Sequence, residues 1–182
     1  MKLKTELMDE MAMRRALMRI THEIIEKNQG TGGLYLVGIK RRGETLAEMI
    51  GENIRKIEGV EIPFGSIDIK YYRDDLSAID ESPHLRRSEL PTDVTGKTIV
   101  LVDDVLYTGR TARAAMEAVI TCGRPKAIQL AVLIDRGHRE LPIRADFVGK
   151  NIPTAHSELI EVRIPPFDDE TRVCLMDSSK GN

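Results

Sequence analysis

The chain has 182 residues, 41% hydrophobic and 31% charged, which is typical of one globular domain with a substantial core. A net charge of −2 excludes nucleic-acid binding through overall basicity, and no apolar run reaches the roughly 18 residues that a membrane helix needs. The two cysteines, Cys122 and Cys174, form no disulfide or metal motif and, with a charged N-terminus, predict a cytoplasmic protein.

Helices and strands alternate along the first half of the chain. Apolar residues at helical spacing predict helices over residues 9–27 and 44–57. Apolar or alternating runs predict strands over residues 34–39, 60–63 and 66–72. Residues 73–95 are polar, contain two prolines and have no periodicity, which predicts a lid or a disordered loop.

The second half continues this alternation. A buried strand from residue 99 ends at Asp103-Asp104 and precedes a helix over 112–119, and another buried strand covers 127–134. Short strands are predicted at 147–150, 157–164 and, at an edge, 173–176. The order implies a right-handed, mostly parallel α/β sheet, in which ligands bind beyond the carboxyl ends of the strands. Charged clusters at Lys40, Asp103 and Asp135 fall there and predict one active site.

The segment from Ile99 to Thr111 carries the strongest chemical signal. Backbone N–H groups at the start of a helix bind phosphate, and the loop before this helix is Val105-Leu106-Tyr107-Thr108-Gly109-Arg110-Thr111. The threonines add hydroxyl donors, Gly109 permits a close backbone approach, and Arg110 adds positive field. Because Asp103 and Asp104 lie just upstream, the segment can hold both ends of a ribose 5-phosphate.

Other interpretations of this segment fit less well. A Walker A loop needs glycine where Asp104 stands, and the Gly-x-Gly-x-x-Gly fingerprint is absent. The alternative is a solvated loop that is acidic by chance.

The segment closely resembles the phosphoribosyl pyrophosphate (PRPP) motif of type I phosphoribosyltransferases. The resemblance implies a central, mostly parallel sheet flanked by helices, with a small hood and a flexible loop. It also implies that Asp103 and Asp104 bind the ribose hydroxyls, that residues 106–111 hold the 5′-phosphate, and that Mg²⁺ enters with PRPP, held mainly by substrate oxygens.

A basic loop, Lys40-Arg41-Arg42-Gly43, follows a predicted strand. The resemblance implies that it receives the pyrophosphate, whose growing negative charge cations stabilise in the transition state. The alternative is a solvated basic turn. In the long loop, which begins Tyr71-Tyr72-Arg73-Asp74-Asp75, we expect Arg73 to reach the pyrophosphate when the loop closes. Core packing of Tyr71 and a turn cap at Asp74-Asp75 are the alternatives.

The acceptor base is expected between residues 135–136 and 147–148. Phe147 can stack on a flat base beside Val148, and Arg136 can donate to an exocyclic oxygen. Simple burial of Phe147 is the alternative. Purine-using relatives carry an acidic residue where this motif has Tyr107, which argues against hypoxanthine or guanine as the acceptor.

Outside the motif, residues 11–28, 37–43, 72–76 and 129–153 resemble the bacterial pyrimidine-operon attenuation proteins, a branch of the family. This closer resemblance implies UMP synthesis from uracil and PRPP, binding of a leader-mRNA stem-loop that is tighter with UMP, and transcription termination. It implies a homodimer or higher oligomer, and one domain over 1–182 with a flexible loop at about 73–95 and a hood from about 136–165 with terminal segments. The RNA-binding residues that it favours are Arg19, His22, Lys27, His138, Arg139, Arg144 and Lys150.

Other functions stay open at this point. Basic residues at i, i+4 and i+7 on the first helix also fit a solvated face, and few aromatics are present for stacking on bases. Met18 stands where some relatives carry threonine, which removes one hydrogen bond to RNA. A phosphoribosyltransferase without RNA binding and a nucleotide sensor without turnover are the alternatives.

Overall fold

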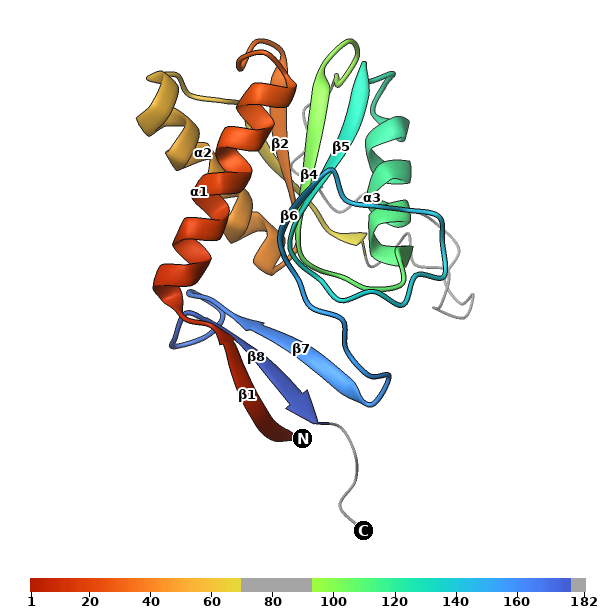
Figure 1. Cartoon of the computed structure of the whole chain (residues 1–182). Helices are drawn as coiled ribbons and strands as arrows, with labels where there is room; N and C mark the ends of the chain where they lie inside the picture. The colour runs from red at the N-terminus through yellow and green to blue at the C-terminus, as the bar shows by residue number, and fades with distance from the viewer. Residues whose placement is uncertain (70–92, 178–182) are drawn as a thin grey trace.

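The protein is described by a computed structural model that covers residues 1–69 and 93–177 (Figure 1). The five-stranded sheet has the order β3-β2-β4-β5-β6, and every neighbouring pair is parallel. Its strands are β2 (Leu34–Ile39), β3 (Phe64–Ile67), β4 (Thr98–Leu106), β5 (Ala127–Asp135) and β6 (Phe147–Asn151). The predicted mostly parallel α/β fold is therefore confirmed.

Helices cover both faces of this sheet. Helices α1 (Glu10–Lys27) and α2 (Arg42–Glu58) pack on one face, and α3 (Arg110–Thr121) packs on the other (Figure 1). One core cluster lies under α1 and α2, where Ile20 and Ile50 meet Val100 of β4. A second core cluster lies under α3, where Ala115 and Val119 meet Leu101. Burial on both faces explains why β2 and residues 99–102 of β4 are continuous apolar runs.

The ends of the helices follow local chemistry. The side chain of Asp9 accepts a hydrogen bond from the backbone N–H of Ala12 at 2.6 Å and caps α1. Gly59, with φ of 70°, ends α2 in the left-handed conformation that glycine adopts without strain. The predicted helix over 9–27 is confirmed, and α2 begins two residues before the predicted 44.

A second, antiparallel sheet has the order β1-β8-β7 and lies below the first in Figure 1. It joins β1 (Lys2–Met8), β7 (Glu158–Arg163) and β8 (Arg172–Asp177). Val162 and Val173 turn their side chains toward the α1 and α2 core. The sheet therefore joins the first and the last described strands, β1 and β8, to β7. The expected hood, from about 136–165 with terminal segments, stays a prediction.

Four sequence-based expectations about strands were wrong. Residues 60–63 form no strand, β3 covers only 64–67, and residues 70–72 of the strand predicted there lie outside the described part. The segment 173–176 is the central strand of its sheet rather than an edge, because β1, which was not predicted, pairs with it. Strand β4 also continues through Asp103 and Asp104, since it pairs with β5 as far as Leu106 and Asp135.

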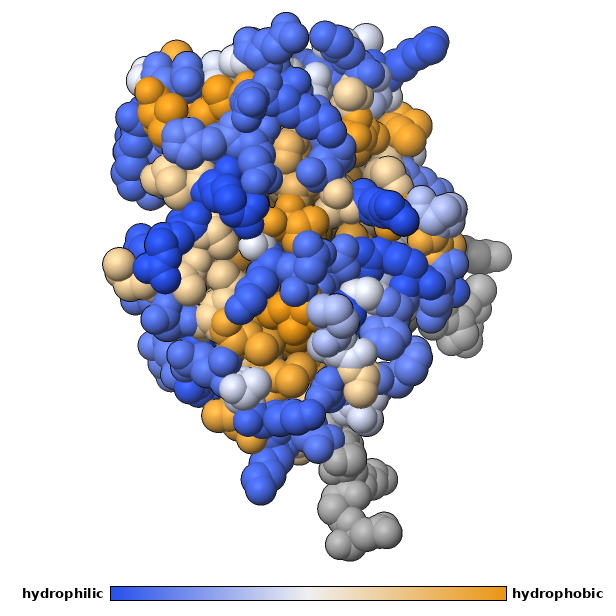
Figure 2. All heavy atoms as spheres, in the orientation of Figure 1, coloured by the Kyte–Doolittle hydropathy of each residue, from blue (hydrophilic) through white to orange (hydrophobic). Residues whose placement is uncertain are grey.

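Residues 136–146, between β5 and β6, form the segment in front of α3 (Figure 1). The surface view in Figure 2 shows hydrophilic residues over α1 and over this segment. Among the described residues, no helix has the length and apolarity to cross a membrane.

Candidate active site and basic surface

A cavity of about 440 Å³ opens at the carboxyl ends of β2 and β4. The basic loop and the acidic pair both line it, as predicted from the strand order. Its lining residues are Ile39, Lys40, Arg41, Arg42, Asp68, Ile69, Asp103, Asp104, Val105 and Thr111. The third charged cluster, at Asp135, lines a different cavity, so the three clusters do not meet in one pocket.

Two glycines bring the basic loop against the acidic strand. A Cβ added at Gly43 would lie 2.3 Å from the carbonyl oxygen of Val102, and one added at Gly38 would lie 2.3 Å from the Cα of Glu44. Only glycine permits these backbone approaches. The first turn of α2 therefore rests directly on β4, which places Lys40 and Arg42 beside Asp103.

The acidic pair is held by its own backbone. The N–H of Asp104 donates to Oδ1 of Asp103 at 2.9 Å, and the N–H of Val105 donates to Oδ1 of Asp104 at 2.8 Å. Burial raises the pKa of Asp103 well above its ordinary value, and the neighbouring Asp104 carboxylate raises it further. Burial also raises the pKa of Asp104, which the positive charge of Arg42 partly offsets. The site thus holds two carboxyl groups whose charge a polar or cationic ligand would stabilise.

Arg42 reaches this cavity already paired. Its Nε and Nη2 donate to the two carboxylate oxygens of Asp168, each at 3.1 Å, and Asp168 also accepts from the N–H of Ile164 at 3.0 Å. Asp168 was not identified from the sequence, because it lies far along the chain in a turn after β7. The pair fixes the direction of the Arg42 guanidinium.

The predicted phosphate loop precedes α3. Gly109, with φ of 93°, is the N-cap residue and has no side chain to cap the helix, while Oγ1 of Thr108 accepts a hydrogen bond from the N–H of Arg110 at 3.3 Å. The carbonyl of Thr108 accepts from the N–H groups of Glu140 and Leu141 at 3.0 and 3.1 Å. Nε of Arg110 donates to Glu140 at 2.7 Å. The loop is therefore braced from outside, while the first N–H groups of α3 remain suited to an anion.

One of the predicted base-binding residues, Phe147, is placed unfavourably for that role. Phe147 is 2% exposed and packs in the core under Lys27, whose Nζ lies 5.4 Å from the ring centroid, so the expectation that this ring stacks on a base was wrong. Val148 and Asp135, two of the positions between which the base was expected, line one cavity. Arg136 is 4% exposed and donates to Oγ1 of Thr154 at 3.0 Å and to the carbonyl of Glu158 at 2.7 Å.

Aromatic groups beside the phosphate loop come from other residues. The guanidinium of Arg136 lies 4.1 Å from the ring centroid of Tyr107, which is 37% exposed. The His138 ring packs edge-on to Tyr107 at 6.0 Å and against His156 at 4.1 Å. His156 was missed, because a single histidine in a polar loop carries no signal of its own.

Five of the predicted RNA-binding residues lie on the two sides of β6 or in it. From α1, Nη2 of Arg19 donates to the carbonyls of Val148 and Gly149 at 3.0 and 2.6 Å, and Lys27 pairs with Asp146. Nζ of Lys150 donates to the carbonyl of Leu7 at 3.2 Å. His22 is exposed on α1, and His138 bonds the carbonyl of Thr154.

Arg139 and Arg144 lie on the other side of β6, in the segment that runs in front of α3. Arg139 pairs with Asp135 and donates to the carbonyls of Tyr107 at 2.7 Å and Ile143 at 2.9 Å. Arg144 is exposed. Arg139 therefore braces the phosphate loop, a role that the sequence did not indicate.

Most of the predicted lid, residues 73–92, lies outside the described part of the chain. The undescribed part also includes the residues to which roles were assigned, namely Tyr71, Tyr72, Arg73, Asp74 and Asp75. Their roles stay predictions.

A sheet with an acidic pair, a helix N-terminus and a basic loop at the ends of two strands is the arrangement of a phosphoribosyltransferase. The family model described as "Phosphoribosyl transferase domain" matches residues 4–164, and the chain belongs to this family. A hypoxanthine phosphoribosyltransferase from Staphylococcus aureus superposes with a TM-score of 0.72 at 18% identity, covering 95% of this chain and 92% of that one. A hypoxanthine phosphoribosyltransferase from Trypanosoma cruzi gives 0.69 at 16% identity, covering 97% and 92%. At such identities the likeness shows the fold alone.

Within the family, the similarity to proteins named "Bifunctional protein PyrR" is much higher. The relative from Caldicellulosiruptor bescii is 60% identical over 170 residues, which cover 93% of each chain. The relative from Thermus thermophilus is 60% identical over 175 residues, covering 96% of this chain and 97% of its own. The chain therefore belongs to the PyrR group of phosphoribosyltransferases.

Proposed function

We propose that the protein transfers the phosphoribosyl group of PRPP to uracil, forming UMP and pyrophosphate, and that it also binds pyrimidine-operon leader mRNA. The single observation that carries the enzymatic part is the cavity of about 440 Å³ shared by Lys40, Arg42, Asp103, Asp104 and Thr111. Each end of PRPP meets a complementary group there.

Each of these groups has a distinct task. The carboxylates of Asp103 and Asp104 accept hydrogen bonds from the ribose hydroxyls, and the start of α3 receives the 5′-phosphate. Lys40, Arg41 and the oriented Arg42 stabilise the charge that grows on the departing pyrophosphate. Arg73 is proposed to join them.

Mg²⁺ suits this cavity chemically, since Asp103 and Asp104 supply the carboxylate oxygens that a hard cation prefers. Among the described residues, no three acidic, histidine or cysteine side chains are grouped closely enough to hold a metal without the substrate. When bound, it would neutralise pyrophosphate charge, held mainly by substrate oxygens.

Uracil as the acceptor is supported by the high identity to the PyrR proteins and by Tyr107 at the position where purine-using relatives carry an acidic residue. The base is proposed to lie against Tyr107, Arg136 and His156. The test is product formation from PRPP and Mg²⁺ with uracil, hypoxanthine, guanine and orotate offered separately. UMP from uracil alone supports the proposal, and a product from a purine alone refutes it.

The regulatory part is supported by the basic residues on both sides of β6 and by the word "bifunctional" in the names of the relatives. We propose that an RNA stem-loop binds there, more tightly with UMP, and so promotes termination. Binding through phosphates must weaken steeply as salt increases. Gel-shift titrations with the leader stem-loop, with and without UMP and at two salt concentrations, test this, and the reverse-complement RNA is the control.

The alternative is uracil phosphoribosyltransferase activity without RNA binding. Ion pairs favour it, because Arg19 pairs with Glu23 and Lys27 with Asp146, so part of the positive charge is neutralised within the protein. UMP synthesis with equal, weak affinity for the leader and control RNAs would support this alternative. A homodimer or higher oligomer is proposed for either case, and sedimentation velocity measures it.

A further inference from the structure

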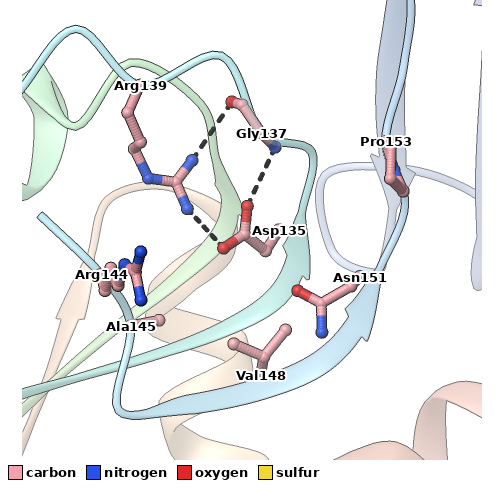
Figure 3. A pocket seen from close by; sticks show the side chains of 8 residues that line it. All are labelled: Asp135, Gly137, Arg139, Arg144, Ala145, Val148, Asn151 and Pro153. Atoms are coloured by element: carbon pink, nitrogen blue, oxygen red, sulfur yellow. Dashed lines mark hydrogen bonds and ion pairs between the residues drawn. The ribbon is translucent and has the colours of Figure 1, made fainter.

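A second cavity, of about 420 Å³, lies between β6 and the segment in front of α3 (Figure 3). It shares no lining residue with the cavity that holds the acidic pair. The residues that line it are Asp135, Gly137, Arg139, Arg144, Ala145, Val148, Asn151 and Pro153. In the reaction proposed above, the base lies against Tyr107, Arg136 and His156, and none of these residues lines this cavity.

One wall of the cavity is a fixed polar group. Asp135 pairs with Arg139 and accepts from the N–H of Gly137 at 3.0 Å. Arg139 is held in turn, because it donates to the carbonyls of Tyr107 and Ile143. Each carboxylate oxygen of Asp135 has two lone pairs, so the group can still accept a hydrogen bond from a ligand.

Two further polar side chains are available to a ligand. Asn151 and Arg144 point toward the cavity in Figure 3. Within residues 1–69 and 93–177, neither side chain has a hydrogen-bond or ion-pair partner. Val148, Ala145 and Pro153 supply apolar surface between these polar groups.

Apolar surface with hydrogen-bonding groups at its border is the chemistry that recognises a nucleic-acid base. An acceptor-only carboxylate selects a base with an exocyclic amino group, and an asparagine amide can donate and accept beside it. Arg144 is exposed at this cavity, whereas Arg19 and Lys150 lie on the opposite side of β6, which is the edge strand of its sheet. A ligand with several phosphates that passes around this edge can contact all three cations, which a free nucleotide cannot.

We propose that this cavity captures one unpaired, amino-bearing base of the bound RNA, with its amino group on Asp135 and its edge on Asn151, while Arg144 contacts an adjacent phosphate. This inference rests on the proposed RNA binding and names the subsite that reads the sequence. Uracil, which has no exocyclic amino group, binds this subsite poorly.

The test combines a protein variant with altered RNAs. Leader stem-loops are synthesised with an abasic site at each unpaired position in turn, and their affinities are measured for the wild type and Asn151→Leu. One abasic position is expected to weaken wild-type binding about tenfold and to have little further effect in Asn151→Leu. Replacing the same base with uracil is expected to weaken wild-type binding similarly.

The controls separate the possible failures. Asn151 is exposed and lies outside the catalytic cavity, so Asn151→Leu is expected to retain wild-type UMP synthesis, which shows that it is folded. Arg15→Gln, an exposed change on α1, is expected to leave the full abasic effect in place. If the wild type binds the stem-loop and no abasic effect depends on Asn151, the subsite is refuted while RNA binding stands. If the wild type binds no leader RNA, both proposals fall.

Discussion

Arg42, which lines the catalytic cavity, donates two hydrogen bonds to the carboxylate of Asp168, each of 3.1 Å. Asp168 lies in the connection between β7 and β8 of the small sheet, whereas Arg42 begins α2, which packs on the parallel sheet. The pair therefore joins the two sheets at the point where pyrophosphate is proposed to leave. Its side chains are 31% and 18% exposed, so solvent screens the pair only in part.

Asp168→Asn is expected to raise KM for PRPP about tenfold with a smaller change in kcat, because Arg42 loses its fixed direction. Steady-state kinetics at varied PRPP measure this. Asp169→Asn, at the exposed neighbouring position, is the matched control and is expected to leave KM unchanged. Equal KM values for the two variants would contradict a positioning role for Asp168.

Asp103→Asn and Asp104→Asn are each expected to lower kcat/KM for UMP synthesis by about 100-fold or more, because charge-assisted hydrogen bonds to the ribose are lost. Asp93→Asn, outside the cavity, is the control for a general effect of lost charge. Wild-type rates in both cavity variants would refute the assignment of the acidic pair.

The raised pKa of Asp103 predicts a pH-dependent stability. The folded state holds the proton more tightly than the unfolded state, so stability falls as pH rises from the unfolded pKa through the raised folded pKa. Without ligand, Asp103→Asn is therefore expected to melt about 3 °C higher than wild type at pH 7, and the difference disappears below about pH 4. Thermal unfolding across this range measures it, and a wild type that is more stable than the variant at pH 7 would contradict the prediction.

Gly43→Ala is expected to destabilise the fold by about 1–3 kcal/mol and to weaken PRPP binding, because its Cβ would meet the Val102 carbonyl at 2.3 Å. Gly32→Ala is the matched control, since nothing lies within 4 Å of a Cβ there. Its free energy of unfolding is expected to change by less than about 1 kcal/mol. Urea unfolding compares the two, and equal stabilities would show that α2 can withdraw from β4 without cost.

Arg139→Ala is expected to weaken both UMP binding and RNA binding, because Arg139 braces the phosphate loop through Tyr107 and also lines the second cavity. Arg144→Ala is expected to weaken RNA binding alone. Calorimetry with UMP and gel shifts with RNA measure the two effects. If UMP and RNA tighten each other in the wild type, linkage requires equal factors, and Arg139→Ala is expected to reduce that factor. An unchanged factor would place the coupling elsewhere.

The catalytic cavity was largely predictable because its parts are local in sequence. The strand, acidic pair, loop and helix of residues 98–121 follow one another without a break, and a parallel sheet brings the ends of β2 and β4 to one edge. The contact between Arg42 and Asp168 was not predictable, because their distance along the chain gives no local signal.

The small sheet was the least predictable part of the fold. Residues 2–8 are mostly exposed and lack the regular apolar alternation that marks a half-buried strand. Their pairing with β8 also shifts register between Leu3 and Thr5 and between Glu6 and Met8. Phe147 was misjudged for a related reason, since an aromatic residue at the start of a strand suits stacking or core packing equally, and only the packing of α1 decides.

The central place of β8 has a consequence for how the chain acquires its structure during synthesis. Strand β1 is synthesised before the other described elements, yet its partner β8 is the last of them. The parallel sheet can form before β1 is paired, because all five of its strands are synthesised before β8. The turn with Asp168, which pairs with Arg42, is also made before β8. The pairing of β1 with β8 is therefore the last step in completing the small sheet.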